Sequence, residues 1–387
     1  MKRRMLLAPD SFKGTLSADQ LCRILKEEFQ PQFPTWELVP LPMADGGEGF
    51  VETCLALCPG RRITCRVTGP LGRPVSAAYA LMEDGTAVVE MAAAAGLPLV
   101  GEEKDPMTAT TYGVGQLLCH AREQGASRIL LGLGGSATND GGIGMARALG
   151  WRFYDAAGRE LPAQARCLGD MVRIVPPDAP FPLPVTAACD VKNPLFGPQG
   201  ATYVFGPQKG VQPQQLPVLD GGLRHLSDLL EALCGIPVGT VPGSGAAGGM
   251  GAAVLSFLQG SLSPGIELLL DMAGFDGRLD QTALVITGEG RLDRQSAFGK
   301  VPAGVAGRCK ARGVPCIALC GSIGEGAEAL YDLGLTAMFS AIRGFADPST
   351  IVQTCEEDFR VLSRSVARLL RRWMDTVPEG DGRQTRS

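Results

Sequence analysis

The sequence predicts an α/β protein in which one α/β domain is interrupted by another. Three observations support this. Apolar strand patterns alternate with amphipathic helix patterns at the start of the chain, the pattern changes to short antiparallel runs near Arg61, and strand and helix patterns alternate again from residue 283. At 387 residues the chain is long enough to bury two cores without disulfides or a structural metal.

The opening residues predict a β-α-β-α arrangement, which is typical of a parallel sheet covered by helices. A strand is expected over residues 5–9. A helix is expected from about Ser17, because Ser17 and Gln20 have the spacing of a capping box. A second strand is expected over 37–41, and a second helix after the glycine-rich loop 44–49.

The following segment predicts an antiparallel meander. Residues 62–67, 75–81 and 86–90 are short apolar runs separated by Gly-Pro and Asp-Gly turn signals. A long stretch rich in glycine and proline follows.

The last third of the chain resumes the strand and helix alternation. We expect strands over 283–287 and 314–319, a helix over about 301–312, and a long final helix from about 350 to 373. The apolar face of that final helix predicts packing against the first domain, and the residues after Pro378 are expected to be disordered.

Composition excludes several classes of protein. A net charge of −4 with no long basic run argues against a protein built around nucleic acid or an anionic membrane. The 12 cysteines contain no CxxC, and only His120 and His225 supply imidazoles, so a zinc site is not expected. Most of these thiols are interpreted as small buried apolar residues, which indicates a reducing compartment, and the apolar run at the start is too short for a signal peptide or a membrane span. We therefore expect a cytoplasmic protein.

Two loops near the N-terminus combine polar side chains with glycine where a predicted strand ends. In residues 10–15, Lys13 could neutralise a phosphate or a substrate carboxylate, although a solvated turn with a helix cap explains the segment equally well. In residues 45–48, two glycines allow a ligand to approach the backbone between Asp45 and Glu48, although for this segment alone a tight turn before a helix, with Glu48 in its first turn, is the better explanation.

Three later loops have the same character. Residues 132–144 follow the apolar strand 129–131 and offer backbone N–H groups, three side-chain donors and a carboxylate, which suits a polyphosphate and its metal. Asp190 ends another predicted strand and is a candidate general base or magnesium ligand, or else a turn cap. Residues 287–294 place a carboxylate between glycines ahead of an arginine and an aspartate, and the alternative is a surface turn with ion pairs.

Two patterns resemble nucleotide motifs only formally. Residues 243–248 match GxGxxG, but Pro242 precedes them and no buried strand leads in. Residues 298–300 resemble the end of a P-loop, but Arg294 replaces its first glycine and Val301 its Ser or Thr.

Five motifs together resemble the glycerate kinase type 1 family, the bacterial glycerate 2-kinases. They extend over nearly the whole chain in family order: APDSFKGT at 8–15, MADGGEG at 43–49, GGSATNDGG at 134–142, PLFGPQGA at 194–201 and TGEGRLD at 287–293. The resemblance implies a Rossmann-like domain over 1–60 and 284–376, an inserted α/β domain with a mixed sheet over 61–283, and a catalytic cleft where they meet. It also implies ATP, magnesium and D-glycerate as the small-molecule substrate, with 2-phosphoglycerate as the product.

Phosphoryl transfer needs an oriented hydroxyl, a bridging metal and cations that meet the developing charge. On this basis the motif residues receive hypothetical roles: Asp190 and Lys13 in catalysis; Asp45, Glu48 and Arg291 in substrate binding; Ser136, Thr138 and Asn139 in cofactor binding; Glu289 and Asp293 as metal ligands. The alternatives are a kinase of another small sugar acid, an NAD-dependent oxidoreductase using the loop at Gly243, or a hydroxy-acid sensor. No nucleic-acid or membrane partner is expected, and a homo-oligomer is compatible with the sequence.

Overall fold

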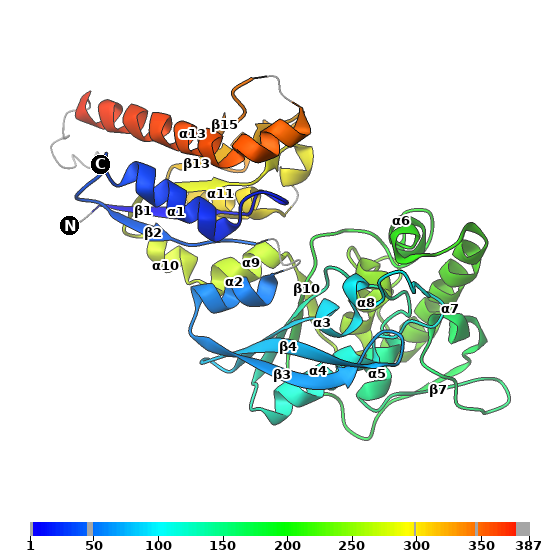
Figure 1. Cartoon of the computed structure of the whole chain (residues 1–387). Helices are drawn as coiled ribbons and strands as arrows, with labels where there is room; N and C mark the ends of the chain where they lie inside the picture. The colour runs from blue at the N-terminus through cyan, green and yellow to red at the C-terminus, as the bar shows by residue number, and fades with distance from the viewer. Residues whose placement is uncertain (1–2, 45–48, 298, 345–346, 377–387) are drawn as a thin grey trace, which may run out of the picture. The chain divides into compact units, whose positions relative to one another are not determined.

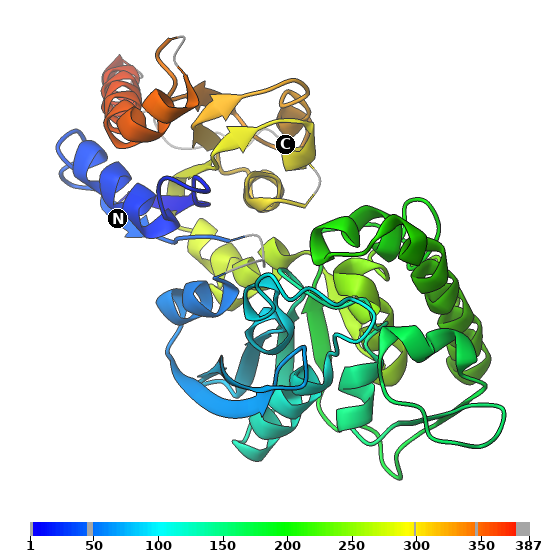
Figure 2. The same cartoon turned by 45° about the vertical axis from the view of Figure 1, so that its right-hand side comes forward.

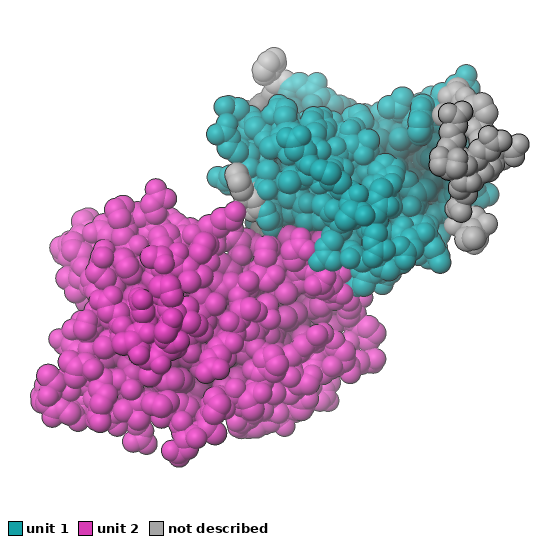
Figure 3. Space-filling model, turned by 180° about the vertical axis from the view of Figure 1, so that it is seen from behind, with its two compact units in different colours: residues 1–44, 273–387 teal, residues 45–272 magenta. Residues whose placement is uncertain are grey.

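The computed structural model describes residues 3–44, 49–297, 299–344 and 347–376 (Figure 1). The chain divides into two compact units (Figure 3). Unit 1 comprises residues 1–44 and 273–387, and unit 2 comprises residues 45–272. The sequence-based boundaries were at 60 and 284. Helix α2 (Phe50–Leu57) belongs to unit 2 because it packs against that unit's strands, and the expected disordered tail 377–387 lies outside the described residues.

Unit 1 contains a five-stranded parallel sheet in the order β2-β1-β11-β13-β15. Its strands are β1 (Arg4–Pro9), β2 (Glu37–Pro40), β11 (Thr282–Gly288), β13 (Cys316–Cys320) and β15 (Ala337–Ser340). Counted in chain order the strands run 2-1-3-4-5, so the direction of winding reverses between β1 and β11. Doubly wound sheets bind ligands outside the carboxyl ends of the strands at such a reversal.

Helices cover both faces of this sheet (Figure 2). Helices α1 (Ala18–Phe29) and α13 (Pro348–Thr376) lie side by side on one face, and α11 (Val301–Ala311) covers the other. The predicted capping box begins α1: Ser17 Oγ accepts from Gln20 N, and the Gln20 side chain accepts from Ser17 N. Short helices α10 (Phe275–Leu279) and α12 (Ala329–Asp332) and the strand pair β12 (Arg291–Leu292) and β14 (Ser322–Ile323) complete the unit.

Unit 2 contains a six-stranded mixed sheet in the order β10-β9-β6-β5-β4-β3. Its strands are β3 (Gly60–Thr68), β4 (Pro74–Met82), β5 (Thr86–Glu90), β6 (Arg128–Gly132), β9 (Val185–Ala188) and β10 (Ser261–Ser263). The predicted meander is confirmed, because β3, β4 and β5 pair antiparallel, whereas β5, β6, β9 and β10 pair parallel. Together the two sheets confirm the α/β class.

The core of unit 2 lies between this sheet and its helices. Apolar side chains such as Val89, Leu131 and Ala187 are buried on the strands, and Leu117, Leu226 and Val254 meet them from the helices. The helices are α3 (Ala92–Ala95), α4 (Tyr112–Glu123), α5 (Ile143–Ala148), α6 (Ala201–Phe205), α7 (Leu216–Cys234), α8 (Ala246–Phe257) and α9 (Gly265–Met272), with a small strand pair β7 (Arg152–Tyr154) and β8 (Arg173–Val175). Among the described residues, none of the helices combines the length and apolar character that crossing a bilayer requires.

Candidate active site

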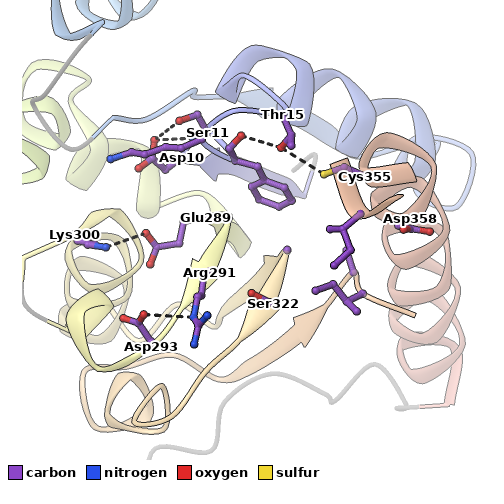
Figure 4. Close-up of a pocket in the computed structure, with 17 residues that line it drawn as sticks. Asp10, Ser11, Thr15, Glu289, Arg291, Asp293, Lys300, Ser322, Cys355 and Asp358 are labelled. Carbon is purple, nitrogen blue, oxygen red and sulfur yellow. Dashed lines mark hydrogen bonds and ion pairs between the residues drawn. The ribbon is translucent and has the colours of Figure 1, made fainter. Parts of the chain in front are cut away.

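Unit 1 has a cavity of about 370 Å³ at the carboxyl ends of its strands (Figure 4). The loops that follow β1, β11, β13 and β15 all contribute to it, so it lies where the winding direction reverses. Its polar lining includes Asp10, Ser11, Lys13, Glu289, Arg291, Asp293 and Lys300, and its apolar lining includes Phe12, Ile342 and Ile351.

Glu289 is the most buried acid of this lining after Asp10, with 6% of its surface exposed. Its Oε2 lies 3.9 Å from the Lys300 Nζ, while its Oε1 has no hydrogen-bond partner among the described residues (Figure 4). Burial raises the pKa of Glu289, and Ser296 and Lys300 oppose that rise. A buried carboxylate oxygen that lacks a partner is suited to bind a cation.

The backbone before Glu289 explains the glycine at position 288. A Cβ there would lie 1.9 Å from the carbonyl oxygen of Leu319 on the neighbouring strand, so a side chain cannot fit. Arg291 and Asp293 follow on the same loop and form an ion pair, with 3.6 Å between Nε and Oδ2.

Lys13 lies in the exposed loop after β1. This loop closes on itself through the bond from Phe12 N to Leu16 O, 2.8 Å, with Gly14 in the left-handed region at φ 82°. At the base of the loop, the buried Asp10 accepts hydrogen bonds from the backbone N–H and the hydroxyl of Ser11, at 2.6 and 3.3 Å. Lys13 therefore reaches the cavity from a loop whose base is fixed.

Unit 2 has a separate cavity of about 320 Å³, at the carboxyl ends of β6 and β9. Its lining is mostly apolar and neutral: Leu97, Leu133, Gly134, Gly135, Ser136, Ala188, Cys189, Asp190, Val191, Phe205, Gln208, Lys209, Ala246 and Ala247.

The loop after β6 contributes lining residues whose backbone N–H groups are not used within the described part of the fold. The N–H groups of Gly134, Gly135 and Ser136 have no hydrogen-bond partner within the described ranges, and Gly135 is left-handed at φ 74°. Consecutive N–H groups around a left-handed residue form a concavity that binds anions.

Lys209 is buried beside this loop, with 1% of its surface exposed. Its ammonium donates to Ser136 Oγ and to the Thr138 carbonyl oxygen, both at 2.7 Å. Burial lowers the pKa of Lys209 to about 7, against the attraction of the Asp140 carboxylate. Asp140 is itself buried and accepts from Thr111 N, Thr111 Oγ1, Gly142 N and Gly144 N at 2.8 to 3.3 Å, which fixes the far end of the loop.

Of the three predicted cofactor-binding residues, one lines the unit 2 cavity and two do not. Ser136 lines the unit 2 cavity, whereas Thr138 and Asn139 are fully buried and outside its lining. Asn139 Nδ2 donates to Thr202 Oγ1 at 2.9 Å, so its side chain packs behind the loop. Asp190 lines the cavity at the end of β9, where its Oδ1 accepts from the backbone N–H of Gly265 at 2.9 Å.

The predicted residues thus fall into two groups, one in each unit. Unit 1 brings together Lys13, Glu289, Arg291 and Asp293, and unit 2 brings together Ser136 and Asp190. Asp45 and Glu48 lie outside the described residues.

Sequence reasoning missed two lysines. Lys300 drew attention only as part of an incomplete P-loop, and Lys209 carried no recognisable pattern. Position alone could have indicated Lys300, since it immediately precedes helix α11. The GxGxxG match at 243–248 follows helix α7 rather than a strand, so it lacks the context of a dinucleotide site.

The fold and its two cavities define a class of protein. A doubly wound parallel sheet with cations and carboxylates at its switch point, and a second cavity with backbone donors and a buried lysine, are features of an α/β enzyme of small anionic molecules.

The comparisons with known proteins identify the family. The sequence matches the glycerate kinase family over residues 5–371. It is 42% identical to glycerate kinase of Bacillus subtilis over 369 residues, which is 94% of this chain and 97% of that one. It is 40% identical to glycerate 2-kinase of Escherichia coli K12 over 382 residues, covering 97% and 98% of the two chains.

A solved structure agrees. A crystal structure of a protein assigned as glycerate kinase 2, from Salmonella typhimurium LT2, superposes with a TM-score of 0.85 at 38% identity, covering 97% of this chain and all of that one. The chain therefore belongs to the glycerate kinase family, which confirms the resemblance seen in its motifs.

Proposed function

We propose that this enzyme transfers the γ-phosphoryl group of ATP to the 2-hydroxyl of D-glycerate, giving 2-phosphoglycerate and ADP. The observation that carries the proposal is the gathering of Lys13, Arg291 and Lys300 with four carboxylates, two of them Glu289 and Asp293, in one cavity of a glycerate kinase fold. Cations and a metal that meet the charge of the transferred group are the main requirement of phosphoryl transfer. The name of the Escherichia coli relative supports the 2-hydroxyl as acceptor.

Magnesium fits the unit 1 cavity. Glu289 and Asp293 would hold it, because magnesium in such enzymes takes one or two carboxylates together with phosphate oxygens. The buried Oε1 of Glu289, which lacks a hydrogen-bond partner in the described structure, supports this assignment. The bound ion would neutralise charge on the phosphate oxygens.

Asp190 is the proposed base. It would take the proton from the 2-hydroxyl while that oxygen forms its bond to phosphorus and the bond between phosphorus and the ADP oxygen breaks. Its bond to Gly265 N fixes one carboxylate oxygen. Lys13 would bind a phosphate oxygen or the substrate carboxylate and stabilise its negative charge.

We place the enzyme in the cytoplasm and expect small molecules as its ligands. All 12 cysteines are free thiols, which agrees with a reducing compartment.

The test is to mix the purified protein with D-glycerate, ATP and magnesium and to follow the products by phosphorus NMR. A 2-phosphoglycerate signal that requires magnesium is the expected result. A 3-phosphoglycerate signal would keep the kinase and refute the 2-hydroxyl as acceptor. No ADP formation by folded protein would refute D-glycerate as substrate, and other small sugar acids would be tried next.

A further inference from the structure

The two cavities differ in the number of charged side chains in their linings, which is seven in unit 1 and two, Asp190 and Lys209, in unit 2. In the described lining of the unit 2 cavity, Lys209 is the sole basic side chain, accompanied by the N–H groups of Gly134, Gly135 and Ser136. One buried ammonium and one concavity of backbone donors match a single small anionic group such as a carboxylate.

The unit 1 cavity has the equipment for a larger and more highly charged ligand. Its lining contains three basic side chains and four acids, of which Glu289 and Asp293 are suited to a metal, and Phe12, Ile342 and Ile351 supply apolar surface. A nucleotide has both parts, a polyphosphate that binds cations and magnesium and a flat base that packs on apolar side chains.

From this difference we propose that the unit 2 cavity is the hydroxy-acid site, in which Lys209 and the N–H groups of Gly134, Gly135 and Ser136 bind the substrate carboxylate, and that the nucleotide binds in unit 1. The inference rests on the proposed function and assigns each of its two substrates to a cavity. It replaces the sequence-based hypothesis that the loop at Ser136 to Asn139 holds the polyphosphate.

The geometry of Lys209 suits this role. Two of the three ammonium hydrogens are committed to Ser136 Oγ and the Thr138 carbonyl, which leaves one for a ligand in the cavity that Lys209 lines. The turn that carries Lys209 is closed by its backbone bond to Gly206 O at 2.9 Å and by the left-handed Gly210 at φ 92°. The lysine is thus held in place before any ligand arrives.

Asp190 completes the match to a 2-hydroxy acid. In such a molecule the hydroxyl is carried by the carbon next to the carboxylate. A cavity that binds the carboxylate therefore holds that hydroxyl a short distance away, and Asp190 belongs to the same lining. Binding and deprotonation of the acceptor would then be functions of one unit.

The test measures equilibrium binding of D-glycerate and of magnesium ADP, each alone, by titration calorimetry. The variants are Lys209→Met, which keeps the length of the side chain, and Lys104→Met, an exposed lysine of the same unit that packs near Gly210 and is outside the lining. We expect Lys209→Met to weaken D-glycerate at least about tenfold, the effect of losing a hydrogen bond to a charged group, and to change ADP less than twofold. Lys104→Met should change neither.

The reverse pattern, weakened ADP with unchanged D-glycerate, would overturn the proposal. A second measurement on the unaltered enzyme does not depend on the variant folding: hydrogen exchange of peptides over residues 133–140 should slow with D-glycerate alone. Slowing with ADP and not with D-glycerate would refute the assignment. Failure of the proposed function is distinguishable, since it would appear as D-glycerate binding without turnover in the phosphorus NMR assay.

Discussion

In each unit the cavity lies at the carboxyl ends of parallel strands, but the two linings differ in chemical composition. In unit 1 the polar lining consists largely of charged side chains on short loops, such as Lys13, Glu289 and Arg291. In unit 2 the polar lining has few charged side chains, Asp190 and the buried Lys209, and includes the loop residues Gly134, Gly135 and Ser136. The comparison teaches that equivalent positions in two α/β sheets can be lined by very different numbers of charged side chains.

The largest effect is expected from Asp190→Asn, which tests whether unit 2 supplies the general base. The amide keeps the shape of the side chain but cannot take a proton, so turnover should fall by about 10² to 10⁴-fold with little change in ADP binding. Steady-state kinetics at saturating substrates measure this. Wild-type turnover would show that unit 2 does not supply the base.

A smaller effect is expected from Lys13→Met in unit 1. Loss of a charge-assisted hydrogen bond should cost about 2 to 3 kcal/mol, which is roughly a 30- to 150-fold rise in the Michaelis constant for the ligand it contacts. The control is Lys26→Met, an exposed lysine at the end of α1. If the nucleotide binds in unit 1, the Michaelis constant for ATP rises. A rise for D-glycerate alone would place the carboxylate in unit 1.

The smallest expected effect is a pH dependence of the free energy of unfolding, which tests the lowered pKa of Lys209. Its pKa is about 7 in the fold and 10.5 as the ordinary value, so between these limits the unfolded chain binds the extra proton. The free energy of unfolding should therefore rise with pH above about 7, by up to about 1.4 kcal/mol per pH unit from this group. Below pH 7 both states are protonated and the contribution is absent.

Trp151 can report this for unit 2 alone, since Trp36 and Trp373 belong to unit 1 and can be replaced by phenylalanine. Urea unfolding of that background at pH 7 to 8.5 should show a more positive slope of the free energy of unfolding with pH than the same background with Lys209→Met, because the contribution of the buried thiols is common to both proteins. Equal slopes would mean that Lys209 keeps its ordinary pKa. Added D-glycerate should reduce the increase of the free energy of unfolding with pH, because a bound anion favours the charged form of Lys209.

The sequence was sufficient to predict the elements whose apolar period is regular. The strands at 5–9 and 283–287, the meander and the capped helix at Ser17 follow from local rules, and the structure confirms them. The 19-residue helix α7 and the strand β10 were not predicted. Helix α7 contains Gly221 and Gly222, and Gly222 packs against Leu168, so that glycine reflects close packing that no local rule reveals, whereas Gly221 faces open space.

The candidate site was predictable where it consists of charged residues in glycine-rich motifs. The motif TGEGRLD at 287–293 predicts Glu289, Arg291 and Asp293 as site residues. All three line one cavity. Thr138 and Asn139 look like ligand donors in the sequence, but only the packing of the loop shows that they lie outside the cavity lining. Lys209 is 73 residues from its partner Ser136, so the contact depends on tertiary structure.

The interrupted chain of unit 1 has a consequence for synthesis on the ribosome. Strand β1 is central in its sheet, yet its neighbour β11 is synthesised only after the whole of unit 2, pairing Leu6 with Val285. Unit 2 is continuous over 45–272, so it can complete its own sheet while β1 still lacks its neighbour β11 and has only β2 beside it. Non-local pairing of this kind is slow and leaves strand edges exposed, and the nascent chain must protect its first 44 residues until the last third has emerged.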